Sequence, residues 1–132
     1  KFTGPTSESG PTSEQFLQRY VFFTDPVYAT TALTIVRQKT PSGFADVEVA
    51  CLGTVTGWQS VGTSGEYEVA HVALISDGEA AQPDCATSRH EASSDGRFGV
   101  TVWGMDEHAS YSYPAGGNVG VLSDVFVPVD PK

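Results

Sequence analysis

The side chains best suited to acid–base or metal chemistry in this chain are its histidines and their acidic neighbours. His90, Glu91 and Asp95 could converge on a divalent cation, but their order matches no known metal-binding loop. We favour a structural role for His90, in which hydrogen bonding holds the start of a strand. His71 has apolar neighbours, and we expect a half-buried imidazole inside a strand. We therefore assign no metal ligand and no cofactor-binding residue.

A second candidate group surrounds a polar loop and two tyrosines. Asp106 and His108 lie in a short polar stretch after Trp103, which could bind a cation or another ligand. The alternation that follows places Tyr111 and Tyr113 on one face of a strand and two serines on the other. Tyrosine flanked by serine is typical of adaptable binding surfaces, and it also suits stacking on sugars. The candidate ligand-binding residues are Trp103, Asp106, Tyr111 and Tyr113, with packing in a β core as the alternative for the aromatic ones.

Catalysis is not indicated by the residue pattern. A nucleophilic serine or cysteine needs an adjacent base that a third group orients. The nearest approach to a Gly-x-Ser-x-Gly elbow, at 62–65, has the composition of a turn. Two acidic pairs, Glu66 with Glu68 and Asp46 with Glu48, each point to one face of a strand, as expected on the solvent side of a sheet. We predict no catalytic residues and no enzyme, with a hydrolase as the least favoured class.

The charge balance restricts the partners. Sixteen acidic and seven basic side chains give the 132-residue chain a net charge of −9. Such a surface repels phosphate backbones and anionic membranes, so we predict no nucleic-acid binding. It attracts cations, which keeps calcium as an alternative ligand. No apolar stretch approaches the length that spans a bilayer, so membrane insertion is not expected.

The elements that must position these side chains are predicted to be strands. Alternating apolar runs bounded by Gly, Pro, Asp and Ser indicate strands at 17–24, 32–37, 46–52, 54–61, 66–75, 98–103 and 119–129. No stripe with a helical period occurs, although a short helical turn is conceivable within 76–88. Closely spaced strands of this kind favour an all-β fold, an antiparallel β-sandwich of jelly-roll or Ig-like type.

Two cysteines are predicted to form one disulfide. Cys51 ends an alternating run and Cys85 lies in a polar loop. A bond between them would close a loop of about 35 residues and stabilise the fold by about 3–4 kcal/mol. Two reduced cysteines are the alternative. We favour the disulfide because an exposed free thiol is a liability in an extracellular protein.

Residues 1–15 differ in composition from the rest. They are rich in Gly, Pro, Ser and Thr and contain the sequence GPTSE twice. We predict a flexible linker there and a single β-sandwich domain over 16–132. The chain starts at Lys1, which fits either a mature product or a fragment of a larger protein, and we favour the fragment.

Three groups of residues resemble the IgGFc-binding family, in particular members found in large secreted bacterial proteins. They are Tyr20–Pro26, then 49–53 with 57–62, and finally 89–91, Phe98–Gly104 and Tyr111–Gly116. Family members often carry glycine between the two aromatics of the last piece, where this chain has Ser112.

The resemblance implies a secreted, extracellular or cell-surface module, attached to neighbouring domains of the same polypeptide. It implies a binding or adhesion role towards a protein or glycoprotein, without catalysis. A carbohydrate-binding module with or without calcium is the first alternative, and a structural or assembly subunit is the second.

Overall fold

The computed structural model describes residues 16–116, so the predicted linker at 1–15 and the predicted strand at 119–129 lie outside the described residues. The described part is all-β, as predicted, with one short 3₁₀ helix, η3, inside the stretch where a helical turn was expected. Its elements are β1 (Leu17–Phe23), β2 (Thr30–Gln38), β3 (Val47–Val49), β4 (Gly53–Thr54), β5 (Gln59–Ser60), β6 (Tyr67–Ser76), β7 (Glu79–Ala80), η3 (Pro83–Ala86), β8 (Arg89–Met105) and β9 (Ser110–Pro114).

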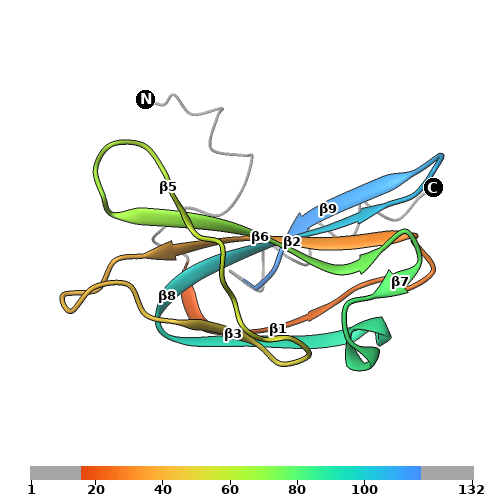
Figure 1. The fold of residues 1–132 in the computed structure, drawn as a ribbon, viewed down its shortest axis with the longest axis horizontal. Coiled ribbons are helices and arrows are strands. Elements are labelled where there is room, and N and C mark those ends of the chain that lie inside the picture. Colours follow the sequence, from red (N-terminus) through yellow and green to blue (C-terminus); the bar gives the residue numbers. More distant parts are fainter. Residues whose placement is uncertain (1–15, 117–132) are drawn as a thin grey trace.

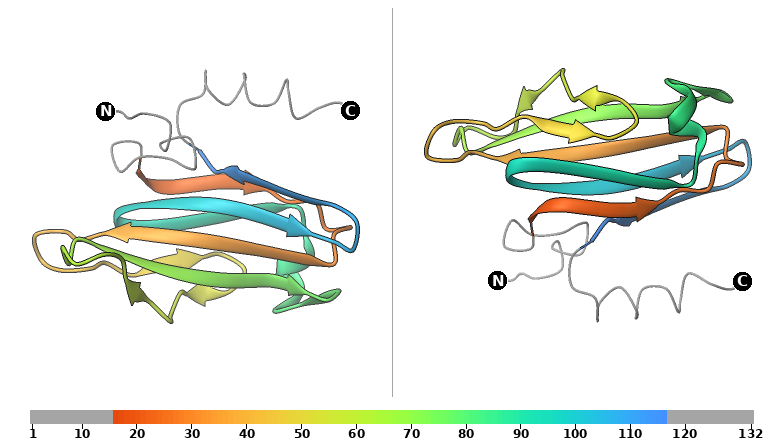
Figure 2. Two further views of the ribbon diagram at one scale, coloured as in Figure 1. Left: turned by 90° about the horizontal axis from the view of Figure 1, so that it is seen from above. Right: turned by 90° about the horizontal axis from the view of Figure 1, so that it is seen from below.

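The strands form one antiparallel sheet that curls into a half-barrel. The predicted β-sandwich, which has two packed sheets, is therefore not confirmed. The order along the main path is β4-β3-β8-β2-β6-β5, with β1 and β9 also pairing with β8 and β7 pairing with β6. In Figure 1, β8 curves round at one end of the molecule and passes from the lower level of the sheet to the upper one. Figure 2 shows β1 and β9 together along one side, with β3, β4 and β5 towards the other.

β8 extends well beyond the predicted strand at 98–103. The Ser-Ser-Asp-Gly sequence, which resembles a turn, lies inside the strand instead of ending it. Its first half pairs with β1 and β3, and its second half pairs with β2 and β9. Between the halves, the register with β1 shifts, since Leu17 lies opposite Phe98 but Arg19 lies opposite Ser93. The Ser-Ser-Asp-Gly stretch therefore forms a bulge that bends the strand. At this bend a β-carbon on Gly96 would come within 2.9 Å of the Thr40 side chain.

The core fills the concave side of the curled sheet. Alternate residues of each long strand point inward, and many are fully buried, as the sequence pattern predicted. The largest fully buried apolar side chains are Phe98, Leu33, Ile35, Leu74, Val47, Val49, Val100 and Val102.

The disulfide between Cys51 and Cys85 is present, as predicted. Cys51 follows β3 and Cys85 lies in η3, so the bond fastens the helical turn to the lower part of the sheet. Cys85 is fully buried against the core, and no free cysteine occurs in the described part of the chain.

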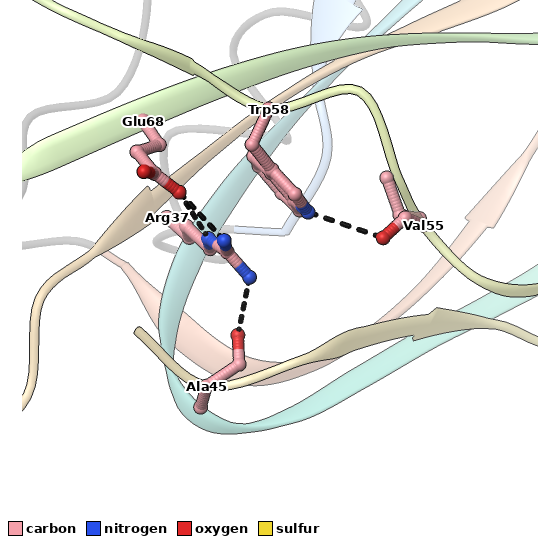
Figure 3. A network of polar contacts seen from close by, with 5 residues as sticks. All are labelled: Arg37, Ala45, Val55, Trp58 and Glu68. Atoms are coloured by element: carbon pink, nitrogen blue, oxygen red, sulfur yellow. Dashed lines mark hydrogen bonds and ion pairs between the residues drawn. The ribbon is translucent and has the colours of Figure 1, made fainter. Parts of the chain in front are cut away.

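A cluster around Arg37 fixes two loops to the sheet (Figure 3). The guanidinium lies 4.0 Å from the centre of the Trp58 ring and donates to a carboxylate oxygen of Glu68 from Nη2, at 2.6 Å. Its Nη1 donates to the carbonyl oxygen of Ala45 at 3.0 Å, while the Trp58 indole donates to the carbonyl of Val55. The arginine thus joins β2 and β6 to the segment that precedes β3 in the chain and to the segment that follows β4.

We expect replacement of Arg37 by methionine to lower the free energy of unfolding by about 2 kcal/mol, because Glu68 would keep a mostly buried charge without its partner. Urea denaturation of the two proteins gives this value. The variant Arg19→Met removes a much more exposed ion pair and should change stability little. Equal effects of the two substitutions would contradict a structural role specific to Arg37.

Candidate binding site

A groove lies between β1 and β9, the two strands that follow one another along one edge of β8. Its volume is about 740 Å³, within the range of ligand-binding clefts. The lining is mainly apolar and aromatic, with one charged side chain. The residues are Val21, Phe22, Phe23, Thr24, Asp25, Tyr28, Ser110, Tyr111, Tyr113 and Gly116.

The two predicted tyrosines bridge this groove. The backbone N–H of Phe23 donates to the Tyr113 hydroxyl at 3.2 Å, and the same hydroxyl donates to the Phe23 carbonyl. The N–H of Asp25 donates to the Tyr111 hydroxyl at 3.0 Å. Burial raises the pKa of both tyrosine hydroxyls. Both therefore stay protonated at neutral pH and hold the end of β1 to β9.

Ring packing fixes the same tyrosines from the side. Tyr111 and Tyr113 are stacked with ring centres 6.2 Å apart, and Tyr28 meets Tyr111 edge to face at 5.0 Å. Gly104 lies opposite Tyr111 in the ladder, and a β-carbon on this glycine would overlap the tyrosine ring. The ring therefore occupies the space that a side chain at position 104 would fill.

Exposed apolar side chains concentrate beside this groove. Of the large apolar residues that are exposed, four belong to β1 or to the turn after it: Leu17, Val21, Phe23 and Val27. Val27 is 77% exposed and Phe23 is 59% exposed. A local concentration of exposed apolar groups at the rim of a cleft is typical of an interaction surface.

The four candidate ligand-binding residues do not come together. Trp103 pairs with Ser112 and lies on the convex face, while Tyr111 and Tyr113 point to the concave side. The Trp103 indole donates to Thr34 on that convex face, at 3.0 Å. Asp106 lies in the loop between β8 and β9, where its carboxylate accepts from the Glu107 N–H. Sequence reasoning also missed the contribution of β1 to the groove, because only the curl of β8 brings β1 and β9 together.

One histidine, His71, differs from its predicted setting. His71 is exposed on β6, not half-buried, and its ring contacts the Thr34 hydroxyl at 3.3 Å. His90 lies at the start of β8, as expected; it is only 3% exposed and stacks on Phe22, with no partner for Nε2 in the described residues. Within residues 16–116, no three His, Cys, Asp or Glu side chains are grouped to hold a metal ion. Nor does that part of the chain contain a helix that could span a membrane.

The buried His90 predicts a pH dependence of stability. Burial lowers the pKa of its imidazole below the ordinary value of 6.5, against a smaller opposing effect of a hydrogen bond to Thr87. Below pH 6.5 the unfolded chain therefore binds more protons than the folded one, so stability falls as the pH drops from 6.5 towards the folded-state pKa. We expect a smaller drop in melting temperature between pH 7.5 and 5.5 for His90→Gln than for the natural protein. Identical slopes in His90→Gln and the natural protein would contradict the assignment.

Comparison with known proteins gives one match. The sequence model of the family described as IgGFc binding protein matches residues 9–104. This range includes most of the chain and ends within β8, so the resembling segment Tyr111–Gly116 lies beyond it. No curated protein and no solved structure matches the chain.

Proposed function

This chain belongs to the IgGFc-binding protein family, and from that membership we propose that it is an extracellular module that binds a protein or glycoprotein partner through the groove between β1 and β9. The family is one of binding domains, is typically extracellular and is not known for catalysis. A disulfide fits an oxidising compartment. We further propose that the chain is part of a larger secreted protein with neighbouring domains.

The observation that carries this proposal is the concentration of exposed apolar side chains on β1 beside an aromatic groove. Phe23 is the strongest single candidate for the contact, because it is large, exposed and part of the groove lining. Aromatic side chains at the centre of an interface commonly carry most of its binding energy. The hydroxyls of Tyr111 and Tyr113 are already engaged with the β1 backbone, so these two residues shape the groove and add aromatic contact area.

Surface plasmon resonance with the full chain tests the proposal. The ligands are a panel of purified secreted glycoproteins that includes a mucin and an IgG Fc fragment. We expect saturable binding to at least one protein, and we expect Phe23→Asp to weaken it about tenfold or more. Val61→Asp changes another exposed apolar residue far along the sheet, next to β5, and should leave the affinity unchanged. Equal loss in both variants, or no binding by the folded protein, would refute the proposal.

A carbohydrate ligand is the second candidate, and Trp103 favours it. This indole is 39% exposed on the convex face and is held by its hydrogen bond to Thr34, which also contacts His71. A fixed, exposed aromatic ring beside polar groups suits stacking on a sugar. A glycan array with and without calcium tests this alternative. Binding that is lost in Trp103→Ala and kept in Phe23→Asp would place a sugar on the convex face.

A further inference from the structure

We propose that the outer edge of β1, at Arg19 and Val21, receives an extended strand of the partner protein, which adds to the sheet by backbone hydrogen bonding. This inference rests on the proposed protein-binding function and specifies the partner. The partner segment is extended, has apolar side chains at alternate positions and carries basic residues.

The backbone of β1 shows which groups face this edge. On the β8 side, the N–H of Thr24 donates to the carbonyl of Ser88 at 2.8 Å. The N–H and carbonyl of Phe23 point the other way, to the Tyr113 hydroxyl. Backbone groups of alternate residues in an antiparallel strand face the same side. Val21 and Arg19, which are in register with Phe23, therefore also direct their N–H and carbonyl groups away from β8.

The partner of Val21 across the ladder confirms this direction. Val21 lies opposite Glu91. The carbonyl of Glu91 accepts from the N–H of Ala50, on the β3 side of β8, so it does not face β1. The Val21–Glu91 pair is thus a non-hydrogen-bonded pair. Among the described strands β1 pairs with β8 alone, which leaves these groups of Val21 without a strand partner there.

The strands at the other edges of the described sheet are short or carry proline, and β6 has no strand partner over 70–73 on the side where β5 and β7 pair with it. β4, β5 and β7 have two residues each, which is too short to template a further strand. β9 carries Pro114, which has no N–H to donate. β1 has seven residues and no proline, and it combines its edge with exposed apolar side chains. β1 therefore combines a longer unpaired edge with exposed large apolar side chains, which the stretch 70–73 of β6 does not, and this combination suits it to strand addition.

The groove defines the side chains that the added strand would carry. Main-chain bonds supply affinity in strand addition, and pockets for alternate side chains supply specificity. The groove beside Val21 is lined mainly by apolar and aromatic groups, so it fits apolar side chains from one face of the strand. Its one charged lining residue is Asp25, and the whole chain has a net charge of −9. Charge complementarity therefore favours lysine or arginine on the partner.

The test uses the full chain and a synthetic nine-residue peptide that alternates valine and threonine with a lysine at each end. We expect saturable binding in calorimetry and slower hydrogen exchange of the Val21 amide in NMR when the peptide is added. Val21→Pro removes the edge N–H without touching the β8 ladder and should weaken binding about tenfold or more. Val21→Thr keeps the N–H and should bind more tightly than Val21→Pro, which separates the loss of the donor from the loss of the valine side chain. A peptide with glutamates in place of the lysines should bind more weakly.

Several outcomes would overturn strand addition. One is a Val21 amide that is already protected in the free, dilute protein, which would mean that the chain's own residues cover the edge. Protection that appears only at high protein concentration would mean that a second copy pairs there. Equal binding by Val21→Pro and Val21→Thr, both shown to be folded by circular dichroism, would also overturn it. If Phe23→Asp abolishes binding to a protein of the panel and Val21→Pro does not, protein binding stands and strand addition fails.

Discussion

Replacement of Gly104 by valine is expected to lower the free energy of unfolding by about 3 kcal/mol, because the new side chain overlaps the Tyr111 ring. The ring cannot stay in place, so the edge-to-face contact with Tyr28 is lost. The hydroxyl that accepts from the Asp25 N–H leaves with it, and the end of β1 loses a connection to β9. Urea denaturation with a constant m-value would measure the loss.

A double-mutant cycle separates the ring overlap from other effects of valine in β8. If overlap with Tyr111 is the cause, Gly104→Val should cost less than about 1 kcal/mol in a Tyr111→Ala background. An undiminished cost in that background would show that the valine acts on the strand itself. Tyr111→Phe keeps the ring and loses only the hydroxyl, so it should cost about 1 kcal/mol and leave the glycine requirement intact.

Removal of the Cys51–Cys85 disulfide is expected to lower the free energy of unfolding by about 3–4 kcal/mol under oxidising conditions. The cysteines are 34 positions apart, so the bond removes a large part of the freedom of the unfolded chain. It also holds η3 against the core, where Cys85 is fully buried. Thermal melts of the natural protein and of Cys51→Ser should differ clearly in oxidising buffer.

Reductant provides the control for this prediction. In dithiothreitol the natural protein should melt close to Cys51→Ser, since both then lack the covalent link. The double variant Cys51→Ala with Cys85→Ala should match the reduced natural protein without leaving a free thiol. A difference between Cys51→Ser and the natural protein that persists in reductant would trace the effect to packing around position 51 instead of the bond.

Much of the sheet was predictable because strands with one buried face show a two-residue period. The alternation of Leu33 and Ile35 marks β2 in this way, and both side chains are fully buried. The predicted strand at 54–61 forms only β4 and β5, because Gly57 adopts a φ of +83° and interrupts it. The half-barrel was not predictable, because its curl depends on a bulge whose Ser-Ser-Asp-Gly sequence also fits a turn.

The candidate site was also predictable only in part, because the local sequence does not encode the curl of the sheet. Alternation alone indicated that Tyr111 and Tyr113 share a face, and the structure confirms it. The candidate residue Trp103 lies on the other face, because cross-strand register pairs it with Ser112. The contribution of Phe23 depends on a contact 90 positions away in the sequence, which no local pattern encodes. The nearest signal was the cluster of aromatic residues around positions 20–28.

The length and late position of β8 have a consequence for how the chain folds. β1, β2 and β3 all pair with this one strand, and the β1 and β2 pairings join residues roughly 70 positions apart. During synthesis the first strands therefore emerge long before the strand that joins them. Loop closure over such distances is slow, so we expect folding in milliseconds to seconds, with the apolar strands exposed to self-association until β8 arrives.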